Sequence, residues 1–179
     1  MIAILCCFLL SPQAAFTDEG VYHISSASDL IYFSKNVSAG TSFEGTTVFL
    51  DADVDFSGGL SEQLEPIGKN NSFSFQGTFD GQGHTINNLT MRSSSQNIGL
   101  FGYPSGVTIR NVVFDSSCSV VSSYTSLNAY AGGIIGMCNS CTVESTVNMA
   151  NVSFMVNLPG HTLVELLVIF MHQIEMKPL

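Results

Sequence analysis

The chain has 179 residues and a formal net charge of −9, with 5 Lys and Arg against 14 Asp and Glu. Charged residues make up only 11% of the chain and hydrophobic residues 45%, which argues against an intrinsically disordered protein. The few cations are dispersed, so the sequence lacks the basic patch expected of a protein that binds nucleic acid. Few charged groups also leave few candidates for acid–base chemistry. The composition favours a secreted, turn-rich β protein.

Residues 1–15 read as a secretory signal peptide. Ile2 to Leu10 is an uninterrupted apolar run, Ser11 and Pro12 break it, and Ala14 and Ala15 offer small residues for cleavage. The run is much shorter than the roughly 20 residues of a membrane-spanning helix, so we expect no transmembrane span beyond the signal.

Cleavage after the signal would leave an odd number of cysteines in an oxidising compartment, namely Cys118, Cys138 and Cys141. One disulfide and one free thiol is the simplest arrangement, and the sequence leaves the pairing open. Cys138 and Cys141 have the spacing of a zinc half-site, but no second pair completes it, so we expect a structural role. Four sequons provide candidate glycosylation sites at Asn36, Asn70, Asn88 and Asn151.

The first part of the mature chain predicts a helix and a strand. Residues 16–38 predict a short helical lead-in, which either Ser26 or Ser28 would cap. Residues 48–56 predict one strand, because apolar residues there alternate with Asp51, Asp53 and Asp55.

An internal repeat dominates the remainder of the chain. The motif Gly99, Leu100, Phe101, Gly102 recurs 34 residues later as Gly133, Ile134, Ile135, Gly136. A partial copy aligns residues 84–89 with residues 107–112 at an offset of 23, which predicts a unit of about 23 residues with an insertion in one copy, at residues 115–130.

Such units bury their apolar side only when they stack, and stacking in parallel also pairs each strand with its equivalent in the next unit. The repeat therefore predicts an all-β fold, a short right-handed parallel β-helix, with the helical lead-in before it and an apolar tail after it. An antiparallel sandwich is the alternative. Glycines at the corners would supply positive φ angles. The predicted inward residues are Phe75, Phe79, Ile86, Leu89, Leu100, Phe101, Ile109, Val112, Ile134, Ile135, Val143 and Val147.

Residues 75–89, 97–102 and 109–112, preceded by residues 24–30, 50–55 and 66–68, together resemble the GLUG-repeat family of secreted and surface proteins. The resemblance covers roughly residues 20 to 150. It implies a right-handed parallel β-helix of an adhesin-like surface molecule and no catalytic residues. The family usually continues through further repeats, whereas this repeat stops near Asn151, which indicates a fragment of a longer repeat protein or a truncated product.

Two groups of residues have the types needed for chemistry. Asp51, Asp53 and Asp55 fall at alternate positions of an EF-hand-like loop, but Phe56 stands where the sharp turn needs glycine, so we expect a solvated acidic face. His84 follows a turn that contains Asp80, and we expect its imidazole to bond a neighbouring coil. The sequence therefore predicts no catalytic residue, no metal site and no cofactor.

The sequence divides into a signal peptide (1–15), a lead-in helix with first strands (16–71), GLUG-like solenoid repeats (72–152) and an apolar tail (153–179) that is either a cap or non-native. The predicted function is adhesion or surface scaffolding by a non-enzymatic protein that is secreted or lies at the cell surface. Surface glycans or other extracellular proteins are the expected partners. The alternative is a carbohydrate-binding module, or a polysaccharide lyase or hydrolase on a β-helix, with Tyr103, Tyr124 and Tyr130 as candidate aromatic contacts.

Overall fold

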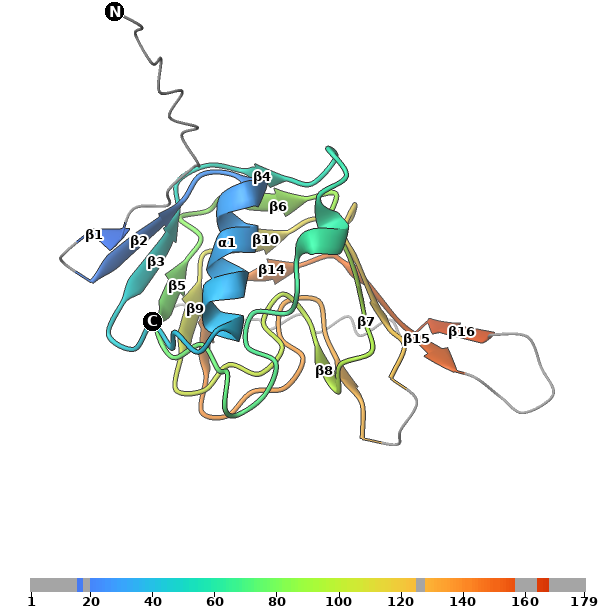
Figure 1. Cartoon of the computed structure of the whole chain (residues 1–179). Coiled ribbons are helices and arrows are strands. Elements are labelled where there is room, and N and C mark those ends of the chain that lie inside the picture. Colours follow the sequence, from blue (N-terminus) through green and yellow to red (C-terminus); the bar gives the residue numbers. More distant parts are fainter. Residues whose placement is uncertain (1–15, 18–19, 125–127, 157–163, 168–179) are drawn as a thin grey trace, which may run out of the picture.

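The computed structural model describes residues 16–17, 20–124, 128–156 and 164–167. In this part the chain winds into a parallel β-solenoid of about three turns with one α-helix (Figure 1). This confirms the predicted all-β parallel solenoid and excludes the antiparallel sandwich. The predicted signal peptide, residues 1–15, lies outside the described residues.

Short strands from successive coils form the faces of the solenoid. The largest sheet has the order β1-β2-β3-β5-β9-β13. Its strands are β1 (Phe16–Thr17), β2 (Val21–Ile24), β3 (Thr47–Leu50), β5 (Thr78–Asp80), β9 (Thr108–Arg110) and β13 (Thr142–Glu144). The second face has the order β14-β10-β6-β4. Its strands are β4 (Val54–Asp55), β6 (Thr85–Asn87), β10 (Val113–Phe114) and β14 (Val147–Asn148).

The third face has the order β16-β15-β11-β7, and a two-stranded sheet pairs β12 with β8. Their strands are β7 (Thr90–Ser93), β8 (Asn97–Ile98), β11 (Ser119–Ser122), β12 (Tyr130–Ala131), β15 (Asn151–Val156) and β16 (Val164–Leu167). All described strand pairs are parallel except β1 with β2 and β15 with β16.

Strand pairing puts equivalent residues of successive coils into columns. One outward column is formed by Thr47, Thr78, Thr108 and Thr142. The inward column beside it is formed by Val48, Phe79, Ile109 and Val143. The predicted 34-residue offset is confirmed in the last described coil, where Phe101 pairs with Ile135 and Val113 with Val147.

The predicted 23-residue unit is wrong. Thr78 pairs with Thr108 and Ile86 with Phe114, which are offsets of 30 and 28 residues. The partial copy had matched two different corners of the coil. Asn88 follows β6 and Asn111 follows β9, and each adopts a left-handed conformation with φ 55°. A short strand followed by a left-handed Asn has a similar sequence whichever face of the solenoid it belongs to, so the segments around β6 and β9 look alike.

Residues 115–130 do not form an 11-residue insertion, although four extra residues lie between Ser122 and Tyr130, since Ser122 pairs with Ser93 at an offset of 29 and Tyr130 with Asn97 at an offset of 33. This segment contains β11, which pairs with β7 on one side and with β15 on the other. Cys118 and Val120 are buried in the core. The solenoid also begins before residue 72, because β2 and β3 belong to the same sheet as β5, and β15 runs across the predicted boundary at residue 153.

The predicted single strand over residues 48–56 is wrong, because β3 ends at Leu50 and β4 begins at Val54 in another sheet. A corner of the coil at residues 51–53 lies between them. The predicted alternation persists through this corner, with Leu50, Val54 and Phe56 buried. Period two in the sequence therefore does not distinguish one strand from two strands that meet at a corner.

The predicted helical lead-in is confirmed only in its second half, where α1 spans Ala27–Ser38 and β1 and β2 precede it. Ser26 is the N-cap, since its side chain accepts a hydrogen bond from the Asp29 N–H. The helix buries Leu30, Phe33 and Val37. The Phe33 ring contacts those of Phe43 and Phe75, with centroids 4.8 and 5.4 Å apart, so α1 joins the aromatic core of the solenoid.

Most predicted inward residues are buried, but the last described coil differs. Val147 is 46% exposed, because its register places it beside Val113, which also faces outward. Asn148 occupies the inward position beside Phe114. Ile135 and Val143 are only partly buried. No helix in the described ranges is long and apolar enough to cross a membrane.

Candidate functional site

The acidic corner at residues 51–55 connects neighbouring coils. Asp51 accepts a hydrogen bond from Gln82 at 3.1 Å and lies 2.7 Å from the Nδ1 atom of His23. Asp53 accepts from the Thr85 N–H at 2.8 Å and contacts His84 Nδ1 at 3.3 Å, as predicted for His84. Asp51, Asp53 and Asp55 are all exposed, as predicted for a solvated acidic face, but they lie around a corner rather than on one strand, and Asp51 and Asp53 also link neighbouring coils.

Backbone and side-chain donors favour the ionised form of Asp53 and Asp55. The hydrogen bond from the Thr85 N–H, assisted by His84, lowers the pKa of Asp53. The Asn88 amide, followed by Ser57, lowers the pKa of Asp55. No group of three or more His, Cys, Asp or Glu side chains that could hold a metal ion occurs among the described residues. The three aspartates do not converge on one point.

A polar cluster of the next coil is centred on Asp80. Its carboxylate accepts from Arg110 Nε at 2.8 Å, from Asn111 Nδ2 at 2.9 Å and from the Gln82 N–H at 2.9 Å. Burial raises the pKa of Asp80, but the bonds from Asn111, Gln82 and Arg110 outweigh it and the pKa is lowered. Sequence reasoning singled out Asp80 but not its contact with Arg110, because the 23-residue offset did not align the two residues.

Glycines such as Gly83 and Gly106 have positive φ angles, as predicted for corners, whereas the motif glycines have a different role. Gly99, Gly102, Gly133 and Gly136 are not among the glycines with positive φ. A Cβ atom on Gly99 would lie 2.8 Å from the backbone nitrogen of Gly136, and one on Gly136 would lie 2.8 Å from the backbone of Ile98. These glycines allow the backbones of successive coils to approach closely.

The three candidate disulfide cysteines separate into a pair and a single residue. Cys138 and Cys141 form a disulfide, with Cα atoms 6.1 Å apart. Cys118 is a free, buried cysteine whose Sγ contacts the Ile86 carbonyl oxygen at 3.2 Å. Burial raises the pKa of the Cys118 thiol, which disfavours the reactive thiolate.

The four sequon asparagines are dispersed over the surface. Asn70, Asn88 and Asn151 are exposed, and Asn36 lies half-buried in α1. The Asn70 Oδ1 atom accepts from the Ser72 N–H at 2.9 Å, and Asn88 Nδ2 donates to Asp55 at 2.8 Å.

The candidate aromatic contacts come from three separate segments. Tyr130 is exposed, whereas Tyr103 and Tyr124 are partly buried. None of the ring contacts found in the described part of the chain joins two of them.

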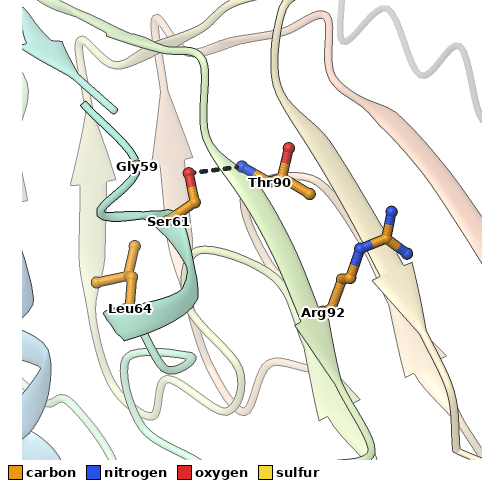
Figure 2. Close-up of a pocket in the computed structure, with 5 residues that line it drawn as sticks. All are labelled: Gly59, Ser61, Leu64, Thr90 and Arg92. Atoms are coloured by element: carbon orange, nitrogen blue, oxygen red, sulfur yellow. Dashed lines mark hydrogen bonds between the residues drawn. The ribbon is translucent and has the colours of Figure 1, made fainter. Parts of the chain in front are cut away.

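A groove that sequence reasoning missed lies beside the edge strand β7. It is lined by Gly59, Ser61, Leu64, Thr90 and Arg92 and has a volume of about 500 Å³ (Figure 2). Ser61 begins a 3₁₀ helix, η1 (Ser61–Gln63), that packs beside β7. The alternation of Thr90, Met91 and Arg92 indicates that Thr90 and Arg92 share a face, but nothing in the sequence places η1 next to them.

Comparison with known proteins gives one distant similarity. No family model matches the chain, and no solved structure matches it. The chain is 29% identical to halomucin of Haloquadratum walsbyi over 141 residues. The match covers 75% of this chain and 2% of halomucin, so the chain spans a very small part of that protein.

Proposed function

We propose that the protein is a secreted or cell-surface β-solenoid that acts in adhesion or as a surface scaffold, within a longer GLUG-like repeat protein. The observation that carries this proposal is the solenoid itself, whose columns present Ser, Thr and Asn outward, such as the column of Thr47, Thr78, Thr108 and Thr142. The similarity to halomucin, a surface glycoprotein, supports the surface location.

The hydrogen bonds that the carboxylates make within the protein support a non-catalytic role for the protein. Hydrolases and lyases that act on polysaccharides need acidic or basic side chains that face the substrate. Here Asp53, Asp55 and Asp80 are each bonded to donors from neighbouring coils or turns. Their pKa values are lowered, whereas a general acid needs a raised pKa.

The location is tested by staining cells of the source organism with antibodies raised against the full chain. The proposal expects labelling of intact cells, or recovery of the protein from the medium, and loss of the surface signal after brief external protease treatment. Labelling that requires permeabilised cells would contradict it. An antibody against a cytosolic enzyme of the same cells controls for leakage.

The adhesive role is tested with beads coated with the full chain. The proposal expects the beads to remain on immobilised surface glycans or extracellular proteins under flow, in excess of beads coated with albumin. Equal retention of both kinds of bead would contradict adhesion. Glycosidase treatment of the secreted protein tests the sequons, and a mobility shift that is lost in an Asn88→Gln variant would assign one glycan to that exposed site.

A further inference from the structure

The four sequons differ in how the fold uses their three residues. All of residues 70–72 are exposed. In the other three sequons the middle residue belongs to the hydrophobic core, as Val37, Leu89 and Val152. An enzyme that modifies the asparagine of a sequon must reach both it and the hydroxyl residue two positions later. In the folded solenoid, residues 70–72 can be reached in this way, whereas the other three sequons require local unfolding.

The hydroxyl groups of the four sequons show the same difference. Ser153 is only 3% exposed, and Thr90 Oγ1 accepts a hydrogen bond of 3.3 Å from β11. Ser38 Oγ donates to the Glu65 carboxylate at 3.4 Å. Ser72 is exposed, and its hydroxyl forms no hydrogen bond with the described residues. The sequon at residues 70–72 therefore has an accessible hydroxyl as well as an accessible asparagine.

A tight turn fixes the Asn70 carboxamide by its oxygen. The Oδ1 atom accepts from the Ser72 N–H at 2.9 Å and from the Phe73 N–H at 3.2 Å. The Nδ2 atom makes no hydrogen bond within the described part of the chain, whereas Asn88 Nδ2 donates to Asp55 at 2.8 Å. The turn thus holds the amide oxygen against the backbone and leaves the amide nitrogen of an exposed side chain available.

Phe73 lies next to this nitrogen. Asn70 and Phe73 form an antiparallel bridge, and opposite residues of an antiparallel pair project their side chains from the same face. The Phe73 side chain is 40% exposed, which makes it one of the large hydrophobic residues that the fold leaves at the surface. The face of an aromatic ring packs well against the C–H groups of a sugar ring, so Phe73 provides a surface for a sugar attached to Asn70.

We propose that Asn70 carries an N-linked glycan in the folded protein and that the first sugar packs against Phe73. In the transfer, Nδ2 bonds to the anomeric carbon of a polyprenyl-diphosphate-linked oligosaccharide and loses one proton to a base of the transferase. The polyprenyl diphosphate leaves with the electron pair of the broken C–O bond. Modification in the cell rests on the proposed secreted or surface location, because such transferases act outside the cytosol.

The site is tested by cell-free transfer to the folded, unglycosylated full chain. The reagents are a single-subunit oligosaccharyltransferase that accepts Asn-X-Ser/Thr and a polyprenyl-diphosphate-linked oligosaccharide. Four synthetic peptides, each with one sequon and its flanking residues, give the intrinsic acceptor rates. The rate in the folded chain divided by the rate in the peptide is expected to be about tenfold or more higher for Asn70 than for the other three, which must first open locally. Mass spectrometry of proteolytic fragments locates the glycan.

Two variants and one spectrum sharpen this test. Ser72→Ala removes the sequon hydroxyl but keeps the backbone N–H that binds Asn70, so the turn remains and transfer is expected to stop. Asn71→Gln changes the exposed middle residue and is the matched control, in which transfer to Asn70 is expected to continue. Nuclear Overhauser spectra of the glycosylated chain are expected to show contacts between the Phe73 ring protons and the first sugar.

Three outcomes would overturn the proposal. A folded-to-peptide ratio at Asn36, Asn88 or Asn151 equal to that at Asn70 would remove the preference for the exposed turn. Transfer that persists in Ser72→Ala would place the modification elsewhere. Absence of contacts between Phe73 and the sugar would exclude the packing. The cell-free assay does not depend on where the protein resides, so an error in the proposed location is detected separately by staining of cells.

Discussion

Asp80 and Arg110 form an ion pair across two successive coils, with the Arg110 Nε atom 2.8 Å from the Asp80 Oδ2 atom. The two residues are in register, since β5 and β9 pair Asp80 with Arg110. Asp80 is only 7% exposed, and donors from Asn111 and Gln82 saturate its other oxygen. One carboxylate therefore connects a strand, a corner and the neighbouring coil.

Substitution Asp80→Asn is expected to lower the free energy of unfolding by about 1–3 kcal/mol, because a buried acceptor is lost and an amide donor faces Arg110. Urea unfolding followed by circular dichroism measures this loss. Glu144→Gln is the matched control, because this substitution also removes one negative charge. Glu144 occupies the same register position in the last described coil and is exposed. Equal losses in the two variants would contradict the role of Asp80.

The corner carboxylates predict a loss of stability in acid. Asp53, Asp55, Asp80 and Asp115 have pKa values lowered from 3.8 in the folded protein. A lowered folded-state pKa contributes stability that is fully present above the unfolded-state pKa and is lost as the pH falls through the folded-state value. The urea concentration at the midpoint of unfolding is therefore expected to decrease when the pH is lowered below about 4. The decrease should be shallower in Asp80→Asn, and an identical decrease in both proteins would exclude Asp80 as a contributor.

Close coil contact at the repeat motif predicts that Gly99→Ala destabilises the protein. The new methyl group would lie within 3 Å of the backbone of Gly136 and Gly132, and backbone atoms cannot move as a side-chain end can. We expect a loss of about 1–3 kcal/mol, as for other overpacked sites. Gly58→Ala is the control, because its Cβ would meet nothing within 4 Å and its φ is not positive. A Gly99→Ala protein as stable as Gly58→Ala would contradict the close-approach role.

The inward column that runs through β3 and β13 contains valines at a fully buried and a partly buried position, so the same Val→Ala substitution can be compared at both. Val48 is fully buried between neighbouring coils, whereas Val143, in the same column, lies in the last described coil and is partly exposed. Val48→Ala is expected to cost about 2–3 kcal/mol and Val143→Ala about 1 kcal/mol or less. Chemical denaturation with a common m value measures both. A larger cost at Val143 would mean that the column does not continue as the register indicates.

Part of this fold could be predicted from the sequence because a solenoid repeats its own contacts. Residues 99–102 and 133–136 stack directly, so their similarity in sequence is a similarity in position. The inward positions Phe79, Ile86 and Ile109 were likewise identifiable, since each is the apolar member of an alternating pair. Ser26 was identifiable as one of two candidate helix caps from its spacing to Asp29.

The remainder depended on contacts between coils that short motifs do not specify. Asn88 and Asn111 adopt the same left-handed conformation at corners that follow strands of different faces. The similarity of the two short segments around them therefore gave the wrong unit length. The pairing of Asp80 with Arg110 follows only from the correct register. The groove beside β7 depends on where η1 packs, and η1 has no strand alternation or side-chain cap that marks its place.

The Cys138–Cys141 disulfide closes a loop within one turn and joins no two coils in the described part of the chain. Closing so short a loop restricts the unfolded chain little, so reduction is expected to leave the stack intact. Under tension along the solenoid axis, the described coils are held together by strand-to-strand hydrogen bonds and core packing, because no disulfide in the described residues joins one coil to the next. The molecule should then yield by peeling away one coil at a time rather than by a single rupture.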